Sequence, residues 1–176
     1  GISSVDQSGL TDSTGTHHDA DVIIYGTGFK ATDFLTPMTI TGRDGADLNA
    51  VWKDGAEAYL GITVRGFPNL FMLYGPNTNL GHNSIIYMLE SQIHYILQCV
   101  AQMDEQDIKA LEVRDRVQDE FNKTVQDKIS NTVWDKGCHS WYKTESGKNT
   151  NNWPGFTFDY RRQTRTLDLS DYDLLR

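Results

Sequence analysis

The chain has 176 residues, and its 24 acidic and 16 basic side chains give a formal net charge of −8. This length is enough for one hydrophobic core, or for one domain and part of another. An acidic chain without a basic run repels phosphates, which disfavours nucleic acid and anionic membranes as partners. No apolar run approaches the roughly 20 residues that span a bilayer, and no leader pattern opens the chain. We therefore expect a cytoplasmic protein.

The cysteines and histidines predict no metal site. Cys99 and Cys138 have the spacing of neither a disulfide framework nor a metal centre, and Cys138 is expected to pack as a small hydrophobic group. The pair His17-His18 has acidic neighbours, but no further ligand follows at a supportive spacing. A solvated turn is the favoured interpretation of this pair.

The first third of the chain predicts short strands between turns. Residues 1–20 are polar and turn-rich, with a weak signal for a hairpin near Ile2–Val5. Val22–Tyr25 is apolar and β-branched, which indicates a buried strand. Residues 30–66 look irregular, apart from one short edge strand predicted at Thr39–Thr41.

The remainder predicts one strand, two helices and a long extension. Leu70–Tyr74 reads as a second buried strand, ended by Gly75-Pro76. A helix is expected from about Ser84 to Met103 with Asn83 or Ser84 as its N-cap, and a second from Asp115 to Asn131 with Asp115 as its cap. The last 45 residues are rich in aromatics, Gly and Asn and have little helical period, so we expect a structured, irregular extension.

Two glycine turns follow predicted strands. Gly26-x-Gly28-x-x-Ala31 formally matches a dinucleotide-binding fingerprint, in which glycines let the backbone approach a pyrophosphate. The stretch that follows has no sustained helical period and is interrupted by Pro37, so a tight turn is favoured over a stand-alone NAD(P) site. The second turn delivers a loop of Gly, Pro and Asn to the start of a long helix. Such a helix end carries unpaired N–H groups and positive potential, which suits an electron-rich ligand.

These segments carry a resemblance to a known family. DVIIYGTGF at 21–29, the block at 52–92 and the run TVWDKGCHSWYKTESGKNTNNWPG at 132–155 resemble the C-terminal half of flavin-dependent class B monooxygenases, and most of all the Baeyer–Villiger monooxygenases. The resemblance implies FAD and NADPH as cofactors. It implies that NADPH reduces the flavin, and that a peroxyflavin formed with O2 inserts one oxygen atom into a ketone. Relatives with this scaffold oxygenate nitrogen or sulfur instead, so the identity of the small organic substrate stays open.

The same resemblance implies an α/β fold: an incomplete FAD/NAD(P)-binding, Rossmann-like fold with a C-terminal aromatic-rich extension. Residues 1–34 would end the NADPH domain, 35–60 would connect, 61–104 would complete the FAD domain and 105–176 would cover the active site. The opening FAD fingerprint, the NADPH fingerprint and the family's catalytic arginine have no counterpart in these residues. We therefore expect a C-terminal piece that is inactive alone, needs the missing N-terminal half of the enzyme, and self-associates through its exposed apolar surface.

The resemblance also implies a set of cofactor contacts, while no catalytic residue is assigned. Trp141 aligns with a family tryptophan that touches NADPH, although an anchoring core aromatic is an equally good interpretation. Lys148, Asn149 and Asn152 are further cofactor-contact candidates, and His82 is disfavoured as an acid–base group. The cofactor-binding residues expected are Gly75, Pro76, Asn77, Asn79, Leu80, Asn83 and Ser84 near the flavin, with Gly26, Thr27, Gly28 and Trp141 near NADPH.

One alternative from another class remains open at this point. A chain that kept the family core but lost the chemistry would be a non-catalytic binding or interaction module.

Overall fold

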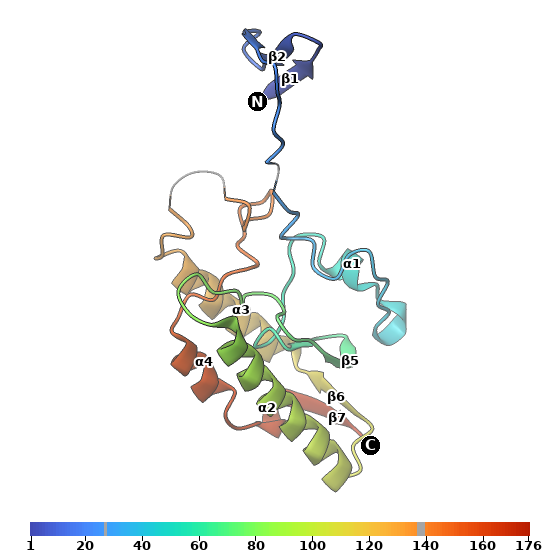
Figure 1. Cartoon of the computed structure of the whole chain (residues 1–176). Helices are drawn as coiled ribbons and strands as arrows, with labels where there is room; N and C mark the ends of the chain where they lie inside the picture. The colour runs from blue at the N-terminus through green and yellow to red at the C-terminus, as the bar shows by residue number, and fades with distance from the viewer. Residues whose placement is uncertain (27, 137–139) are drawn as a thin grey trace.

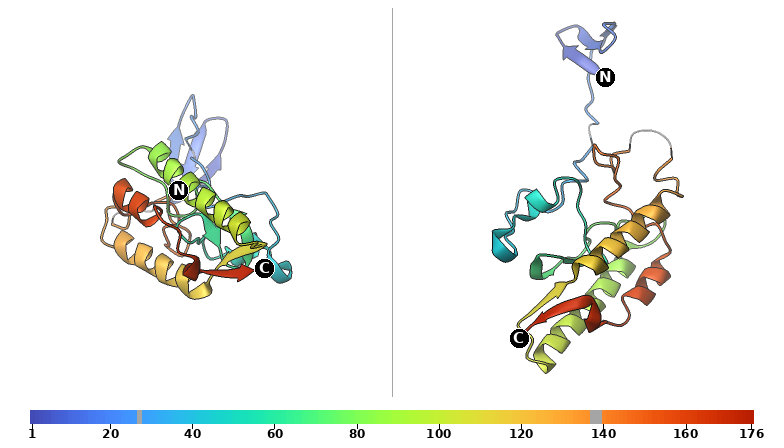
Figure 2. Two further views of the ribbon diagram at one scale, coloured as in Figure 1. Left: turned by 90° about the horizontal axis from the view of Figure 1, so that it is seen from below. Right: turned by 180° about the vertical axis from the view of Figure 1, so that it is seen from behind.

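A computed structural model describes residues 1–26, 28–136 and 140–176. A small sheet at the N-terminus stands apart from a larger α/β body, and a single extended linker joins the two (Figure 1). The view from behind shows the same separation (Figure 2, right). Among the described residues, no helix combines the length and the apolar character needed to cross a bilayer.

The N-terminal sheet is a three-stranded antiparallel meander in the order β1-β2-β3. Its strands are β1 (Ile2–Val5), β2 (Gly9–Asp12) and β3 (His17–Asp19), which confirms the hairpin predicted near Ile2–Val5. The Asp12 carboxylate holds the turn after β2, because it accepts hydrogen bonds from the Thr14 amide at 2.8 Å, the Thr14 hydroxyl at 2.6 Å and the Thr16 amide at 3.1 Å. It also faces His18 Nε2 at 2.9 Å.

The buried strand predicted at Val22–Tyr25 is wrong for this structure. The segment forms the extended linker, and Val22 and Ile24 are 76% and 90% exposed. A strand exists only where a neighbour satisfies its backbone groups, and no described strand pairs with this segment. The edge strand predicted at Thr39–Thr41 is likewise absent, since only Thr41 forms an isolated bridge, to Asp47.

The body contains two small antiparallel sheets. The strand predicted at Leu70–Tyr74 lies three residues earlier, because positive-φ Gly66 turns the chain into a hairpin and the strand ends before Met72. The second sheet was not predicted; it joins segments about 60 residues apart, which periodicity alone cannot reveal. The elements are η1 (Arg43–Gly45), α1 (Leu48–Val51), β4 (Thr63–Val64), β5 (Phe67–Phe71), β6 (Ala110–Val113), η2 (Leu169–Asp171) and β7 (Tyr172–Leu175).

Three helices pack beside one another in the body (Figure 1). The helices α2 (Ile85–Glu105) and α3 (Asp115–Ile129) confirm both predicted helices. Ser84 is the N-cap of α2, as expected, whereas α3 is capped by Arg114 and Asp115 is its first residue. The third helix, α4 (Thr157–Gln163), was missed because a seven-residue helix is too short to show a period.

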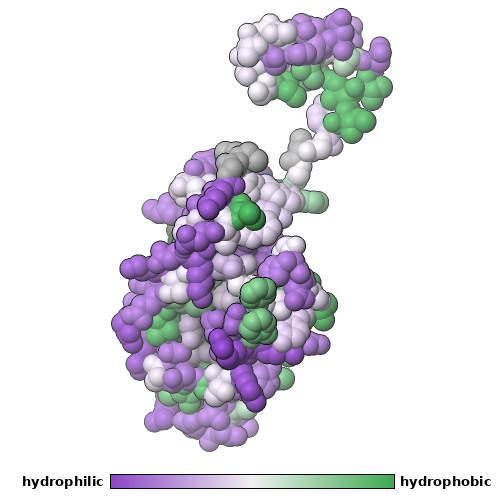
Figure 3. Space-filling view, turned by 90° about the vertical axis from the view of Figure 1, so that its left-hand side faces the viewer, coloured by the Kyte–Doolittle hydropathy of each residue, from purple (hydrophilic) through white to green (hydrophobic). Residues whose placement is uncertain are grey.

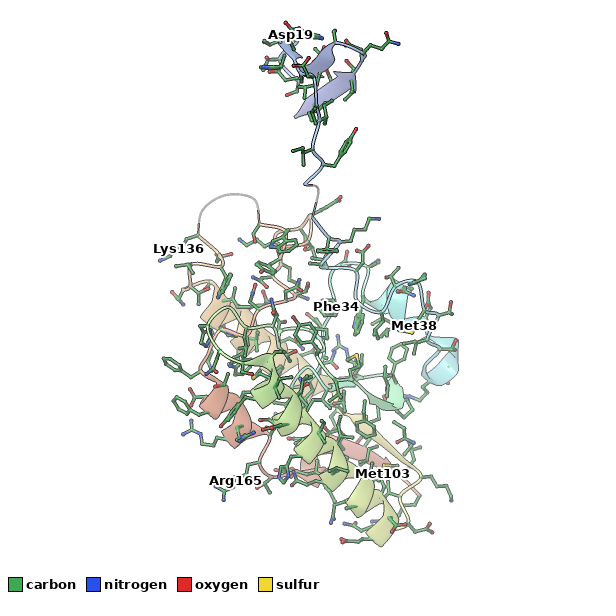
Figure 4. All side chains as sticks on the ribbon, in the orientation of Figure 1. Asp19, Phe34, Met38, Met103, Lys136 and Arg165 are labelled. Atoms are coloured by element: carbon green, nitrogen blue, oxygen red, sulfur yellow. The ribbon has the colours of Figure 1, made fainter. Side chains whose placement is uncertain are left out.

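Buried side chains form three clusters. The central one joins Leu60 and Ile62 to Tyr95 of α2 and Tyr172 of β7, whose hydroxyls are 3.1 Å apart. Burial raises the pKa of both tyrosines, and it raises the pKa of Cys99 to about 12, so this thiol is a packing group. A second cluster surrounds Trp52, whose ring meets that of Phe34 edge-on with ring centroids 6.3 Å apart. Phe34 lies beside α1 (Figure 4). The third comprises Met88, Val125, Ile129, Trp153 and Tyr160.

The Asp12 turn generates a prediction about pH. Hydrogen bonds from the Thr14 hydroxyl and from His18 hold the pKa of Asp12 well below its ordinary value of 3.8. A depressed carboxylate pKa stabilises the fold above the unfolded value and loses this contribution only as pH falls through the folded value. Cross-strand NMR contacts between Leu10 and His18 should therefore persist from pH 7 to pH 4. Asp12→Asn should weaken them at pH 7, whereas Asp21→Asn, which removes the same charge in the linker, should not. Equal loss in both variants would contradict the assignment.

Candidate functional site

The loop that leads to α2 begins with a close contact between two backbones. Gly75 lies directly against Gly61, and a Cβ on Gly75 would stand 2.3 Å from the Gly61 carbonyl oxygen. A Cβ on Gly61, which has a φ of 65°, would in turn meet Thr78. Gly75 and Pro76 are buried. These two predicted site residues therefore shape the loop from inside and do not face solvent in this chain.

Asn77 and Asn79 pair the loop with a segment some 70 residues later. The Asn77 amide donates to the Thr150 carbonyl at 2.8 Å, and its side-chain Nδ2 donates to the carbonyls of Asn149 and Asn152 at 2.9 and 3.2 Å. The Asn79 amide donates to Asn151 at 2.9 Å, and its carbonyl accepts from the Trp153 amide at 2.8 Å. We call this pairing of residues 77–79 with residues 149–153 the asparagine junction.

Most polar groups of the asparagine junction are satisfied internally. Asn149 Nδ2 donates to Asn152 Oδ1 at 2.9 Å, and Asn149 Oδ1 accepts the backbone amides of Asn151 and Asn152. Two buried atoms, Asn77 Oδ1 and Asn152 Nδ2, have no partner among the described residues. Since an unmade buried hydrogen bond costs about 1–3 kcal/mol, the rest of the junction must offset this cost.

The loop ends at an open helix terminus. Leu80 is partly buried in the third cluster, and Gly81 lies so close to Trp134 that a Cβ on it would stand 2.6 Å from the indole ring. Asn83 and Ser84 are exposed, and Ser84 makes no side-chain capping bond to α2, although Asn83 Oδ1 accepts its amide at 2.7 Å. The start of this 21-residue helix therefore lies at an exposed end of the loop, where the helix carries positive potential that suits the electron-rich ligand expected from the sequence.

The residues predicted to contact NADPH lie at the linker or beside it. Gly28 has a φ of 72°, and a Cβ placed on it would lie 3.5 Å from Trp141. The ring of Phe29 is 6.4 Å from that of Trp141. Trp141 is 48% exposed, so it is not a core anchor of this chain. Gly26, two residues before Gly28, is exposed. The predicted cofactor contact Thr27 and the predicted packing residue Cys138 lie outside the described residues.

An aromatic row connects the two groups. The Trp141 ring is 5.2 Å from Tyr142, and Tyr142 meets Trp134 edge-on at 5.6 Å. Trp134 is the indole that supports Gly81 at the start of α2. The structure thus brings the glycine turn of the linker and the loop before α2 onto one continuous aromatic surface.

The disfavoured histidines show no catalytic arrangement. His82 is exposed, and its ring meets Phe156 edge-on at 6.3 Å. His17 lies 3.3 Å from both Asp6 and Asp19, and no group of three or more His, Cys, Asp or Glu in the described ranges is placed to hold a metal ion. Lys148 forms an ion pair with Glu57.

Some residues that build this site were not singled out from the sequence. Gln92 lies on the inner face of α2, where its Oε1 accepts the Tyr74 amide at 3.0 Å and its Nε2 donates to the Tyr160 hydroxyl at 3.1 Å. Gln126 of α3 donates to the Asn149 carbonyl at 2.9 Å. The available signal was a glutamine on the apolar face of each predicted helix.

Known proteins are similar to this chain in sequence and in fold, although no protein-family model matches the chain. A Baeyer–Villiger monooxygenase of Pseudomonas aeruginosa is 47% identical over 99% of this chain and 33% of its own length. A crystal structure of cyclohexanone monooxygenase from Rhodococcus sp. Phi1 bound to NADP+ matches with a TM-score of 0.79 and 27% identity, over 99% of this chain and 34% of that one. OTEMO in complex with FAD and NADP matches with a TM-score of 0.79 and 25% identity, over 98% and 33% of the two chains.

The chain corresponds to the C-terminal portion of the Baeyer–Villiger monooxygenase family. It spans about a third of the length of the curated relatives that it matches. The expected fold class is confirmed, since a mixed α/β body matches part of FAD- and NADP-bound members of that family.

The asparagine junction generates a stability prediction for this portion of a Baeyer–Villiger monooxygenase. Asn77→Ala removes the two hydrogen bonds that Asn77 Nδ2 donates to buried carbonyls. It also leaves alanine, whose side chain forms no hydrogen bond, at a backbone φ of 58°. We expect a loss of about 2 kcal/mol in the free energy of unfolding, measured by urea denaturation. Glycine adopts this positive φ without strain, so Asn77→Gly measures the loss of the side-chain hydrogen bonds alone. Asn131→Ala, at the exposed end of α3, should change stability little, and an equal loss there would contradict the prediction.

A matched glycine pair tests the backbone contact below the loop. Gly75→Ala forces a methyl group into the Gly61 carbonyl, so we expect a loss of about 1–3 kcal/mol in the free energy of unfolding. Gly26→Ala meets no atom within 4 Å and has no positive φ, so its midpoint of thermal unfolding should equal that of the parent chain. A stable Gly75→Ala variant would show that the loop is not fixed by this contact.

Proposed function

We propose that this chain is part of an FAD- and NADPH-dependent monooxygenase that inserts one oxygen atom from O2 into a ketone of a small organic substrate. The observation that carries the proposal is the 47% identity to a Baeyer–Villiger monooxygenase along 99% of the chain. The open start of α2 and the exposed indole of Trp141 support it, because both suit the cofactors named for the matched structures.

The residues that precede α2 fit the isoalloxazine end of FAD. Asn83 and Ser84 are exposed at the start of α2, where the positive potential of the helix end favours a flavin that carries negative charge. The Asn83 side chain donates to Thr157 Oγ1 at 2.9 Å and accepts the Ser84 amide at 2.7 Å, so it holds this end of the helix in place. Asn79 and Leu80 bring the backbone of the loop to the same end of the helix. Gly75, Pro76 and Asn77 act beneath the surface, since they fix the loop through Gly61 and the asparagine junction. When bound, FAD supplies the activation of O2 once NADPH has reduced the flavin.

NADPH is assigned to the linker side of the aromatic row. The sequence predicts a glycine turn at Gly26, Thr27 and Gly28, and the exposed face of Trp141 beside Gly28 offers a flat apolar surface for a ribose or a nicotinamide. The Tyr142 and Trp134 rings link this surface to the end of α2. The role of these residues is to orient two cofactors relative to each other and to exclude water between them.

The proposal includes a partner, the N-terminal part that the longer relatives possess. One face of α2 is apolar and exposed along its length, which is typical of a helix face that another surface covers. The linker segment Val22–Tyr25 is also apolar, and none of the described strands pairs with it. We assign residues 1–34 to the end of the NADPH domain, 35–60 to a connection, 61–104 to the FAD domain and 105–176 to a cover over the active site. The exposed residues of α2 are Ile86, Ile93, Leu97 and Val100.

Fusion to the N-terminal two thirds of the Pseudomonas relative tests the function. The fused protein should bind FAD and oxidise NADPH faster when a cyclic ketone is added, with an ester or lactone as the product. The 176-residue chain alone should not retain FAD on gel filtration and should elute as an oligomer. A folded, flavin-loaded fusion that never couples NADPH oxidation to a ketone would contradict the proposed reaction.

Trp141 provides the residue-level prediction. In the fused enzyme, Trp141→Ala should raise the KM for NADPH about tenfold, because the loss of a large apolar contact surface weakens binding more than it changes the chemical step. Trp141→Phe keeps a flat apolar face and should restore most of the affinity. Steady-state kinetics at varied NADPH separate the effects. A fall in kcat with an unchanged KM in both variants would contradict a cofactor contact.

A further inference from the structure

A cavity of about 550 Å³ lies between α2 and α4, on residues that the proposed cofactor site does not use. Its volume falls within the range of small-molecule pockets, roughly 300–1,000 Å³. The surrounding side of the molecule is mostly hydrophilic, with small hydrophobic patches (Figure 3). The residues that line the cavity are Tyr87, Glu90, Ser91, His94, Phe158, Arg161, Arg162, Thr164 and Arg165.

Arg161 is held in place at the wall of this cavity. Its guanidinium lies 3.6 Å above the Tyr87 ring, its Nε donates to Ser91 Oγ at 3.2 Å, and its Nη2 pairs with Glu90 at 2.9 Å. Ser91 is 2% exposed and is fixed by donating to the Tyr87 carbonyl at 2.8 Å. A guanidinium that is already oriented loses little entropy when it binds a planar anion.

The charge of the cavity opposes that of the chain. Three arginines of α4 and its C-terminal end line it against one carboxylate, whereas the whole chain has a net charge of −8. Arg162 pairs with Asp159 at 3.1 Å, and within the described ranges the Arg165 side chain forms no ion pair. Arg165 lies at the foot of α4 (Figure 4), where its carbonyl accepts from His94 Nε2 at 3.1 Å. Positive charge concentrated in an acidic protein attracts anions to this place.

Apolar and aromatic groups also line the cavity. Phe158 of α4 is exposed and stacks on Phe156 with ring centroids 5.5 Å apart. Thr164 is 1% exposed, and its hydroxyl is already engaged because it donates to the Tyr160 carbonyl at 3.0 Å. A ligand that fits both the arginines and these groups has a compact apolar body and one oxyanion.

The geometry points to a binding site for a small aromatic or alicyclic carboxylate between α2 and α4, with Arg161 and Arg165 as the partners of the carboxylate and Phe158 against the ring. The site is separate from the cofactor surface and does not depend on the proposed oxygenation.

Benzoate is the probe that tests this site, on the 176-residue chain without FAD or NADPH. Backbone amide NMR shifts of Tyr87, Ser91, Phe158 and Thr164 should change saturably with added benzoate, and the affinity should fall as salt is raised. Benzyl alcohol has the same ring without the charge, so it should bind at least about tenfold more weakly. Equal binding of both compounds, or shifts that never saturate, would overturn the site.

Variants locate the anion. Arg165→Gln leaves the packing of α4 intact and should weaken benzoate binding several-fold, and Arg161→Gln should weaken it at least about tenfold. Arg116→Gln removes the same charge from an exposed position of α3, where the arginine pairs with Glu120, and should leave binding unchanged. If Arg161→Gln unfolds the chain, Arg165→Gln alone decides. Benzoate affinity that is the same in Arg165→Gln and Arg116→Gln would overturn the assignment.

Discussion

The asparagine junction is the constraint on which the candidate site depends. Residues 77–79 are a loop, so neither a helix nor a sheet satisfies their backbone groups, yet Asn77 and Thr78 are buried. Buried backbone donors and acceptors must find partners, and here they find them in residues 149–153. This requirement ties the start of α2 to the segment that carries Trp141, although about 60 residues separate them.

Asparagine is suited to this task because one side chain can donate twice and accept at the same time. Asn77 uses Nδ2 to bridge two carbonyls, and Asn149 uses both ends of its amide within its own turn. Asn77 also takes a left-handed backbone, which asparagine tolerates better than most residues. Two further atoms of the junction, Asn77 Oδ1 and Asn152 Nδ2, are buried and have no partner among the described residues.

Local patterns predicted the elements that carry their own signal, and failed where the structure depends on distant partners. The stripe of apolar residues gave α2 and α3 almost to the residue, because a long amphipathic helix needs only its own period. The pairing of β6 with β7, and of Asn77 with Asn149, joins segments that no window of sequence contains. The strand predicted at Val22–Tyr25 is wrong because a strand also needs a partner: its residues suit a strand, but no described strand pairs with them. The loop before α2 and Trp141 were singled out from the sequence and stay predictions as cofactor contacts, while the aromatic row that connects them came only from the structure.

The helix α2 presents three faces with different surroundings. The inner face carries Gln92, Tyr95 and Cys99 into the cores, and there a polar Gln92 is tolerated because Tyr74 and Tyr160 satisfy both ends of its amide. A second face is apolar and exposed, which is stable only when another surface covers it. A third face meets α4 through Arg161, and its polar contacts fix the angle between the two helices. Any partner that covers the second face therefore presses on a helix whose N-terminus is the candidate flavin end and whose side borders the arginine cavity. A rigid-body shift of α2 would couple these places, and the packing of its inner face against the cores limits such a shift.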